Sequence, residues 1–166
     1  MSTDETRSVG PMGWVCVPLR MQLGALFLLA AYNKLVPQGE GPTSSGPQGF
    51  AWTIKAFKLG LPDWMVMAST FVTPWIELTA AALLIVGLWT RAAAAVIAAL
   101  LAMFIVMLLS VIVRKLNVEC GCFGDISPFC KGEVGWCHIY QDFVMLAVAV
   151  MIMVTPRHGF ALRREG

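Results

Sequence analysis

The chain of 166 residues has little charge, since only 13% of its residues are Asp, Glu, Lys or Arg. A soluble domain carries about a quarter, so this shortage argues against a water-soluble fold. The Lys and Arg residues form no basic stripe and the net charge is only +2, so no nucleic-acid partner is expected. The sequence also lacks a nucleotide-binding loop, a haem-attachment motif, a lipid-attachment signal and a hydrolase triad, which argues against those functions.

Apolar residues, in contrast, make up 58% of the chain. Helices of about 20 apolar residues cross a bilayer, and none of the apolar runs alternates like a porin strand. Because a lipid-exposed backbone must satisfy its own hydrogen bonds, the runs are read as helices. The sequence therefore predicts an all-α integral membrane four-helix bundle over residues 14–156, with spans at about 16–36, 64–88, 92–113 and 137–154.

The two ends of the chain are polar. Residues 1–13 are expected to be disordered, and residues 157–166 form a loose basic tail. A cleaved signal peptide is an alternative for the first apolar run. A signal peptide begins with a basic segment and ends at a small-x-small cleavage site. Asp4 and Glu5 make this segment acidic and no such site follows, so an uncleaved first helix is favoured.

A loop rich in Gly, Pro and Ser follows the first span, and then comes "FAWTIKAFKLGLP". Its apolar and basic residues fall on different faces of a helix, which predicts a short amphipathic helix in the headgroup layer. A re-entrant segment packed on the bundle is the alternative. The apolar face comprises Phe50, Ile54, Phe57 and Leu61, and the basic face comprises Lys55 and Lys58.

Four of the five cysteines lie close together, in and just after "ECGCFGDISPFC" at residues 119–130. Cys120 and Cys122 are one residue apart, and a disulfide in so small a ring would be strained and would exchange readily. Cys130 and Cys137 are the candidate exchange partners, so the leading hypothesis is a thiol relay at the membrane surface. Cys16, at the opposite membrane face, is expected to be a buried small hydrophobe.

Two other interpretations of this loop stay open. Two ordinary disulfides could simply staple it, or its four cysteines could bind a metal. Zinc prefers pairs spaced C-x₂₋₄-C, which this loop does not match, so no metal ligand is assigned.

Charged residues also fall within the predicted spans. Glu77 lies near the middle of the second span, where a charge costs about 2.5–3.5 kcal/mol. It is either a proton carrier or a structural group paired with Arg20 on the first span, and structural pairing is slightly favoured because most buried polar groups are satisfied.

A polar cap is expected beneath the cysteine loop, because Lys34 and Asp142 lie near the same membrane level and could pair. A Lys34 ammonium close to Cys120 or Cys122 would favour the reactive thiolate. Neighbours on a helix point about 100° apart, so no Cys137–His138 catalytic couple is expected. The residues of this cap are Tyr32, Asn33, Lys34, His138 and Asp142.

Four spans place both termini on one side of the membrane and the cysteine loop on the other. The Lys and Arg residues divide evenly between the sides, so the positive-inside rule gives no orientation. Clustered cysteines usually form disulfides or carry out redox reactions outside the cytoplasm. The side of the membrane with the cysteine loop is therefore expected to face away from the cytoplasm.

Four stretches of the chain together resemble a known family. They are "LRMQLGALFLLAAYNKL", "TPWIELTAAALLIVGLWTRAAA", "CGCFGD" and "WCHIYQDFVMLAVAVMI". Over about residues 18–155 the chain is similar to the MauE branch of the DoxX-like membrane proteins. Two departures stand out: Gln141 lies where an Arg is expected before Asp142, and Cys130 and Cys137 are additions to the basic pattern.

The resemblance implies a redox-associated protein of the bacterial inner membrane with a periplasmic cysteine loop. Cys120 and Cys122 would be the redox pair, and the electrons would pass to a partner redox protein, a larger membrane complex or a quinone. Maturation of a periplasmic redox enzyme is one role it implies. A non-catalytic anchoring subunit of a respiratory or redox complex is the alternative, so whether the protein is an enzyme stays open.

Overall fold

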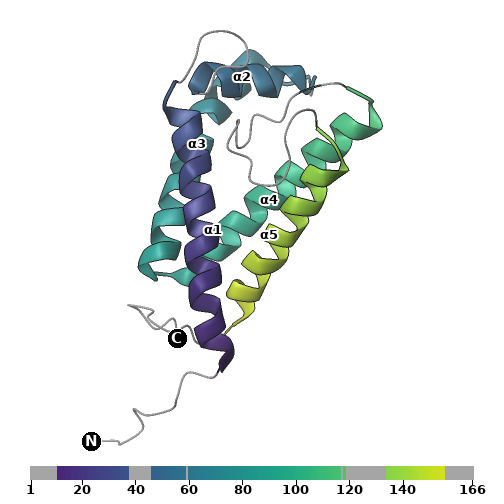
Figure 1. Ribbon diagram of the computed structural model, residues 1–166. Helices are drawn as coiled ribbons and strands as arrows, with labels where there is room; N and C mark the ends of the chain where they lie inside the picture. The colour runs from purple at the N-terminus through teal and green to yellow at the C-terminus, as the bar shows by residue number, and fades with distance from the viewer. Residues whose placement is uncertain (1–10, 38–45, 59, 117, 119–133, 156–166) are drawn as a thin grey trace, which may run out of the picture.

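The computed structural model describes residues 11–37, 46–58, 60–116, 118 and 134–155. Within these ranges the chain forms α-helices and turns (Figure 1). The helices are α1 (Pro11–Leu35), α2 (Pro47–Ala56), α3 (Asp63–Val86), α4 (Thr90–Val113) and α5 (Trp136–Val154).

Four of the described helices, α1, α3, α4 and α5, are long and apolar enough to cross a membrane. This confirms the predicted all-α membrane bundle. Large apolar side chains cover the outside of these helices, including Trp75 and Val106, as expected for surfaces that face lipid. The first helix begins at Pro11, earlier than expected, because a proline is well suited to the first turn of a helix.

The four long helices pack as two antiparallel pairs, α1 with α3 and α4 with α5. The first turn of α1 and the last turn of α5 lie at one end of the bundle, and α2 lies across the other end (Figure 1). A tight turn at Gly87 joins the pairs: its φ of 81° is left-handed, a conformation that glycine adopts without strain. Its backbone N–H donates to the Leu83 carbonyl at 3.0 Å and closes α3.

Small side chains let the long helices approach one another. Ala81 and Ala94 are fully buried in the core. At Gly24 of α1, an added Cβ would lie 2.6 Å from Ile85 Cγ1 and 3.3 Å from the Ala81 carbonyl oxygen. Close approach of this kind gives membrane helices the van der Waals contact that holds them together.

Helix α2 is amphipathic, as predicted, but it ends at Ala56, so Phe57, Lys58 and Leu61 of the predicted faces lie beyond it, and Leu61 is exposed. Phe50 and Ile54 are buried and pack with Val66 of α3, whereas Trp52 is exposed. Just beyond the helix, Phe57 is buried among residues of α4. The apolar face of α2 thus covers the end of the bundle, and its polar face points outward.

Candidate functional site

A buried ion pair lies inside the bundle. The Lys34 ammonium, from the last turn of α1, donates to both carboxylate oxygens of Glu77 on α3, at 2.5 and 2.7 Å. The two side chains are only 2% and 1% exposed. Each charge costs about 2.5–3.5 kcal/mol at the centre of a bilayer, so the pairing keeps both of them inside the membrane.

Two aromatic rings enclose the same ammonium. The Lys34 Nζ lies 5.1 Å from the ring centroid of Phe50 on α2 and 5.1 Å from that of Phe104 on α4. A cation within about 6 Å of a ring face is attracted by its quadrupole. Lys34 therefore ties α1 to α3 through charge, and to α2 and α4 through aromatic contact.

Helix α5 also carries a buried polar face. His138, Gln141 and Asp142 are all buried, and residues three and four apart share a helical face. The Gly135 backbone N–H donates to His138 Nδ1 at 3.4 Å, which leaves the ring proton of a neutral imidazole on Nε2. Asp142 interacts with the charge of Lys34 through space. We call Lys34, Glu77, His138, Gln141 and Asp142 the polar centre.

Gln141 has an unusual environment. Its Oε1 is buried and accepts no hydrogen bond within the described part of the chain. Sequence reasoning treated Gln141 only as a departure from a family pattern, and it missed the contributions of Phe50 and Phe104. The recurrence of polar residues at 138, 141 and 142 was the signal, because this spacing puts them on one face.

The expected pairing of Glu77 with Arg20 is wrong. Arg20 lies fourteen positions before Lys34 on α1, about 21 Å along the helix axis. Glu77 of α3 lies beside Lys34, at the other level, and pairs with it instead. Arg20 is buried near Cys16, and its Nε and Nη1 have no hydrogen-bond partner among the described residues. Cys16 is buried, as predicted, and donates to the Thr155 hydroxyl at 3.5 Å.

The predicted polar cap is partly correct. Asn33, Lys34, His138 and Asp142 are buried, but Tyr32 is 51% exposed. Tyr32 is two residues from Lys34, which places it about 200° around the helix and therefore on the outer face.

Of the candidate redox cysteines, the described part of the chain contains Cys137. It lies in the first turn of α5 with an exposed side chain, and its sulfur is in a disulfide. The other described cysteine, Cys16, is free. Cys120, Cys122 and Cys130 lie outside the described residues, as does the expected proximity of Lys34 to that pair.

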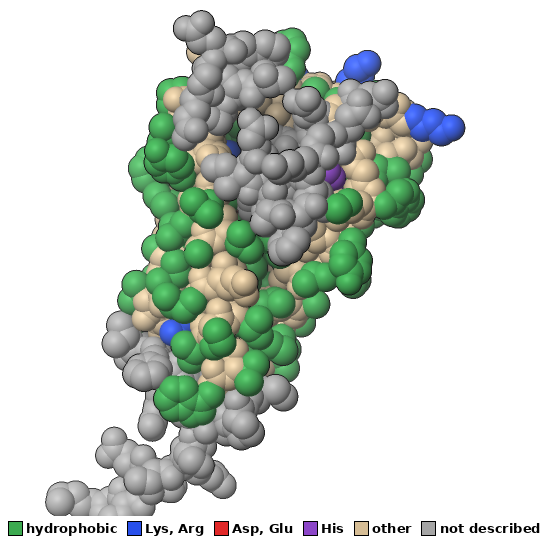
Figure 2. Space-filling view, in the orientation of Figure 1, with side chains coloured by type: hydrophobic (Ala, Val, Ile, Leu, Met, Phe, Trp, Pro, Cys, Tyr) green, Lys and Arg blue, Asp and Glu red, His purple; other side chains and the backbone are tan. Residues whose placement is uncertain are grey.

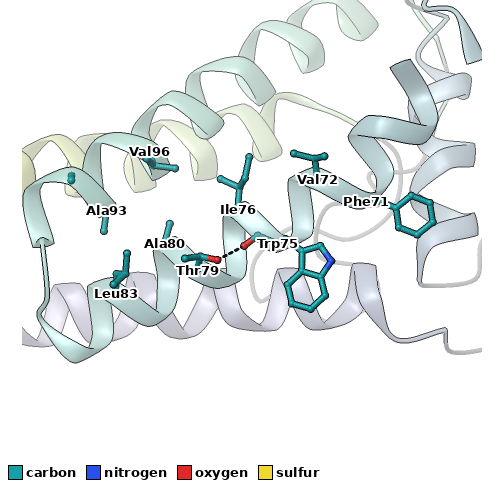
Figure 3. A pocket seen from close by; sticks show the side chains of 10 residues that line it. Phe71, Val72, Trp75, Ile76, Thr79, Ala80, Leu83, Ala93 and Val96 are labelled. Atoms are coloured by element: carbon teal, nitrogen blue, oxygen red, sulfur yellow. Dashed lines mark hydrogen bonds between the residues drawn. The ribbon is translucent and has the colours of Figure 1, made fainter. Parts of the chain in front are cut away.

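An apolar groove of about 510 Å³ runs between α3 and α4 on the outer surface (Figure 3). The Thr79 hydroxyl, which lies in it, donates to the Trp75 carbonyl at 2.7 Å. With that hydroxyl satisfied, the groove suits an acyl chain or an apolar helix better than a polar ligand. Other lining residues are Phe71, Val72, Ile76, Ala80, Leu83, Ala93 and Val96.

The fold and the polar centre define a multi-pass membrane protein with an ionic core and a cysteine in the first turn of the last described helix. The chain belongs to the family described as Methylamine utilisation protein MauE, whose profile matches residues 12–155. No curated protein and no solved structure matches the chain.

Proposed function

We propose that this protein exchanges disulfides at its cysteine loop, on the periplasmic side of the bacterial inner membrane. The observation that carries this proposal is the disulfide at Cys137, on an exposed first turn of α5. The family name, with its reference to methylamine utilisation, supports a role in maturing a periplasmic redox enzyme. The similarity of "CGCFGD" to the DoxX-like pattern supports Cys120 and Cys122 as the first redox pair.

The proposed reaction transfers two electrons between sulfur pairs. A thiolate of the partner attacks one sulfur of a disulfide in the loop, that S–S bond breaks, and a mixed disulfide forms. The second partner thiolate then attacks the mixed disulfide, so the partner leaves oxidised and the loop is left with two thiols. A quinone substrate could then take two electrons and two protons from these thiols, which would restore the loop disulfide.

The polar centre contributes a rigid support for this loop. Lys34 links α1, α3, α2 and α4 through the contacts given above, and α5 presents Asp142 to the same charge. The end of the bundle beneath Cys137 is therefore held in one arrangement. A fixed support keeps reactive groups within reach of a docked partner.

A non-catalytic role is the second candidate, in which the chain anchors a larger redox complex and its disulfides are structural. The closed Lys34–Glu77 pair favours this candidate, because a saturated ion pair needs no chemistry to explain it. In that case the disulfide at Cys137 would resist reduction.

Redox titration of the purified full-length protein separates the two candidates. A loop disulfide in equilibrium near about −200 mV would support exchange, whereas one that stays oxidised below about −300 mV would support a staple. Cys122→Ser leaves Cys120 without its resolving thiol, so when the Cys120 thiolate attacks the disulfide of the oxidised partner, in the reverse of the reaction above, the mixed disulfide should stay trapped. Cys16→Ser serves as the control because that thiol is buried. Absence of any adduct, together with an intact host pathway in Cys122→Ser cells, would refute exchange.

A further inference from the structure

Four cations gather where the C-terminal ends of α2 and α4 meet. They are Lys55, Lys58, Arg114 and Lys115, all with exposed side chains, and we call them the basic corner. Arg114 Nη1 donates to the backbone carbonyls of Phe57 at 3.3 Å and Lys58 at 2.9 Å. Arg114 thereby brings the end of α2 to the end of α4, and Lys58 to the neighbourhood of Lys115.

Packing holds the basic corner in place. Phe57 is only 2% exposed and lies in an apolar cluster with Leu108 and Val111 of α4. The two helix ends cannot separate without exposing this ring to water or lipid headgroups. The backbone positions that carry these cations are therefore fixed relative to one another.

One cation of the basic corner has an acidic partner in the described part of the chain. Lys55 Nζ lies 2.9 Å from Asp63 Oδ1, on the surface. Lys58, Arg114 and Lys115 remain as a group of like charges. Such a group attracts an anion from outside the protein.

The position of the basic corner in the molecule indicates which kind of anion it attracts. Arg114 directly follows the last residue of one membrane-crossing helix, and Asp63 begins another. Trp64, 70% exposed, directly follows Asp63, and Trp52, 58% exposed, lies three residues before Lys55, the partner of Asp63. Trp side chains concentrate at the headgroup level of a bilayer. Figure 2 shows Lys and Arg side chains projecting at its upper right, over the end of α4 and beside α2.

We propose that the basic corner binds the phosphate group of an anionic phospholipid, with Lys58 and Lys115 as its contacts and Arg114 fixing their spacing. Basic groups at this level of a membrane protein attract anionic headgroups at about 1 kcal/mol for each cation, which corresponds to about fivefold in affinity. The lipid would hold α2 against the end of the bundle. An acidic soluble protein is disfavoured because the flanking Trp side chains belong at the lipid level.

Native mass spectrometry of the full-length protein in detergent tests this, with phosphatidylglycerol and phosphatidylcholine as competing probes. The wild type should retain phosphatidylglycerol preferentially. The double variant Lys58→Gln/Lys115→Gln should lose this preference by on the order of 25-fold, and Lys58→Arg/Lys115→Arg should keep it. The control Arg91→Gln/Arg157→Gln removes the same charge elsewhere in the chain and should leave the preference unchanged.

Three results would overturn the proposal. One is equal retention of both lipids by the wild type, and another is a control variant that loses the preference as strongly as the Lys variant. A third is survival of the lipid preference in Lys58→Gln/Lys115→Gln, which would show that another part of the chain binds the lipid. None of these results depends on the redox state of the cysteines, so the test is independent of the proposed exchange reaction.

Discussion

Single residues decide the electrostatics of this bundle. Lys34 satisfies Glu77 with two hydrogen bonds, while the guanidinium of Arg20 is buried with two nitrogens unpaired among the described residues. The Lys34–Glu77 pair therefore needs no further partner, whereas the Arg20 guanidinium still needs a hydrogen-bond acceptor. The charges in the middle and in the last turn of α1 therefore differ in how completely they are satisfied.

The Lys34–Glu77 pair gives a prediction at this scale. Lys34→Met leaves an uncompensated carboxylate inside the bundle and should lower the free energy of unfolding by about 3–5 kcal/mol. Replacing both residues, as Lys34→Met/Glu77→Met, should restore much of that loss because no charge is left unpaired. Denaturant titration in mixed micelles measures both changes. A double variant no more stable than Lys34→Met would contradict this account of the pair.

The sequence predicted which charges enter the membrane but not how they pair. Glu77, Lys34 and Arg20 stand out because a charge in an apolar run is conspicuous. Their pairing depends on how far α3 is shifted along α1, and local sequence does not encode that offset. The same holds for Gln141, whose position in the interior follows from the rotation of α5.

At the scale of elements, the contact between α1 and α3 depends on Gly24. A side chain there would meet Ile85 at 2.6 Å, so Gly24→Leu should force the helices apart and destabilise the protein by about 1–3 kcal/mol. The neighbouring variant Ala25→Leu adds the same side chain on an exposed face and should be nearly neutral. Both are measured by denaturant titration, and equal losses for the two variants would disprove close helix packing at Gly24.

The elements themselves were predictable from the sequence. Span length and hydrophobicity are local properties of the sequence, so all four long helices were expected. The spacing of Phe50 and Ile54, which puts them on one helical face, predicted α2. What the sequence did not show is that Lys34 reaches under Phe50, because that contact joins separate segments. Partnerships between elements are thus harder to predict than the elements.

At the scale of the whole molecule, the orientation in the membrane remains a prediction. In intact spheroplasts, after reduction, a membrane-impermeant maleimide should label Cys137 in a chain whose other cysteines are Ser. Trp89→Cys in a chain whose five native cysteines are all Ser should stay unlabelled, because this exposed residue lies in the α3–α4 turn at the other end of the bundle. Labelling of Trp89→Cys and protection of Cys137 would place the cysteine loop in the cytoplasm and remove the basis for disulfide exchange there.

The Lys34–Glu77 pair also has a consequence for biogenesis. Both partners lie in the first half of the chain, so they leave the ribosome before α5 exists. A hairpin of α1 and α3 can therefore enter the lipid with the charges of Lys34 and Glu77 neutralised against each other, whereas each helix alone would carry its charge into the lipid unpaired. Asp142 arrives last, and its helix meets an ammonium already in place. We expect the newly made first half of the protein to partition into the bilayer cooperatively, with the final helix joining a preassembled half-bundle.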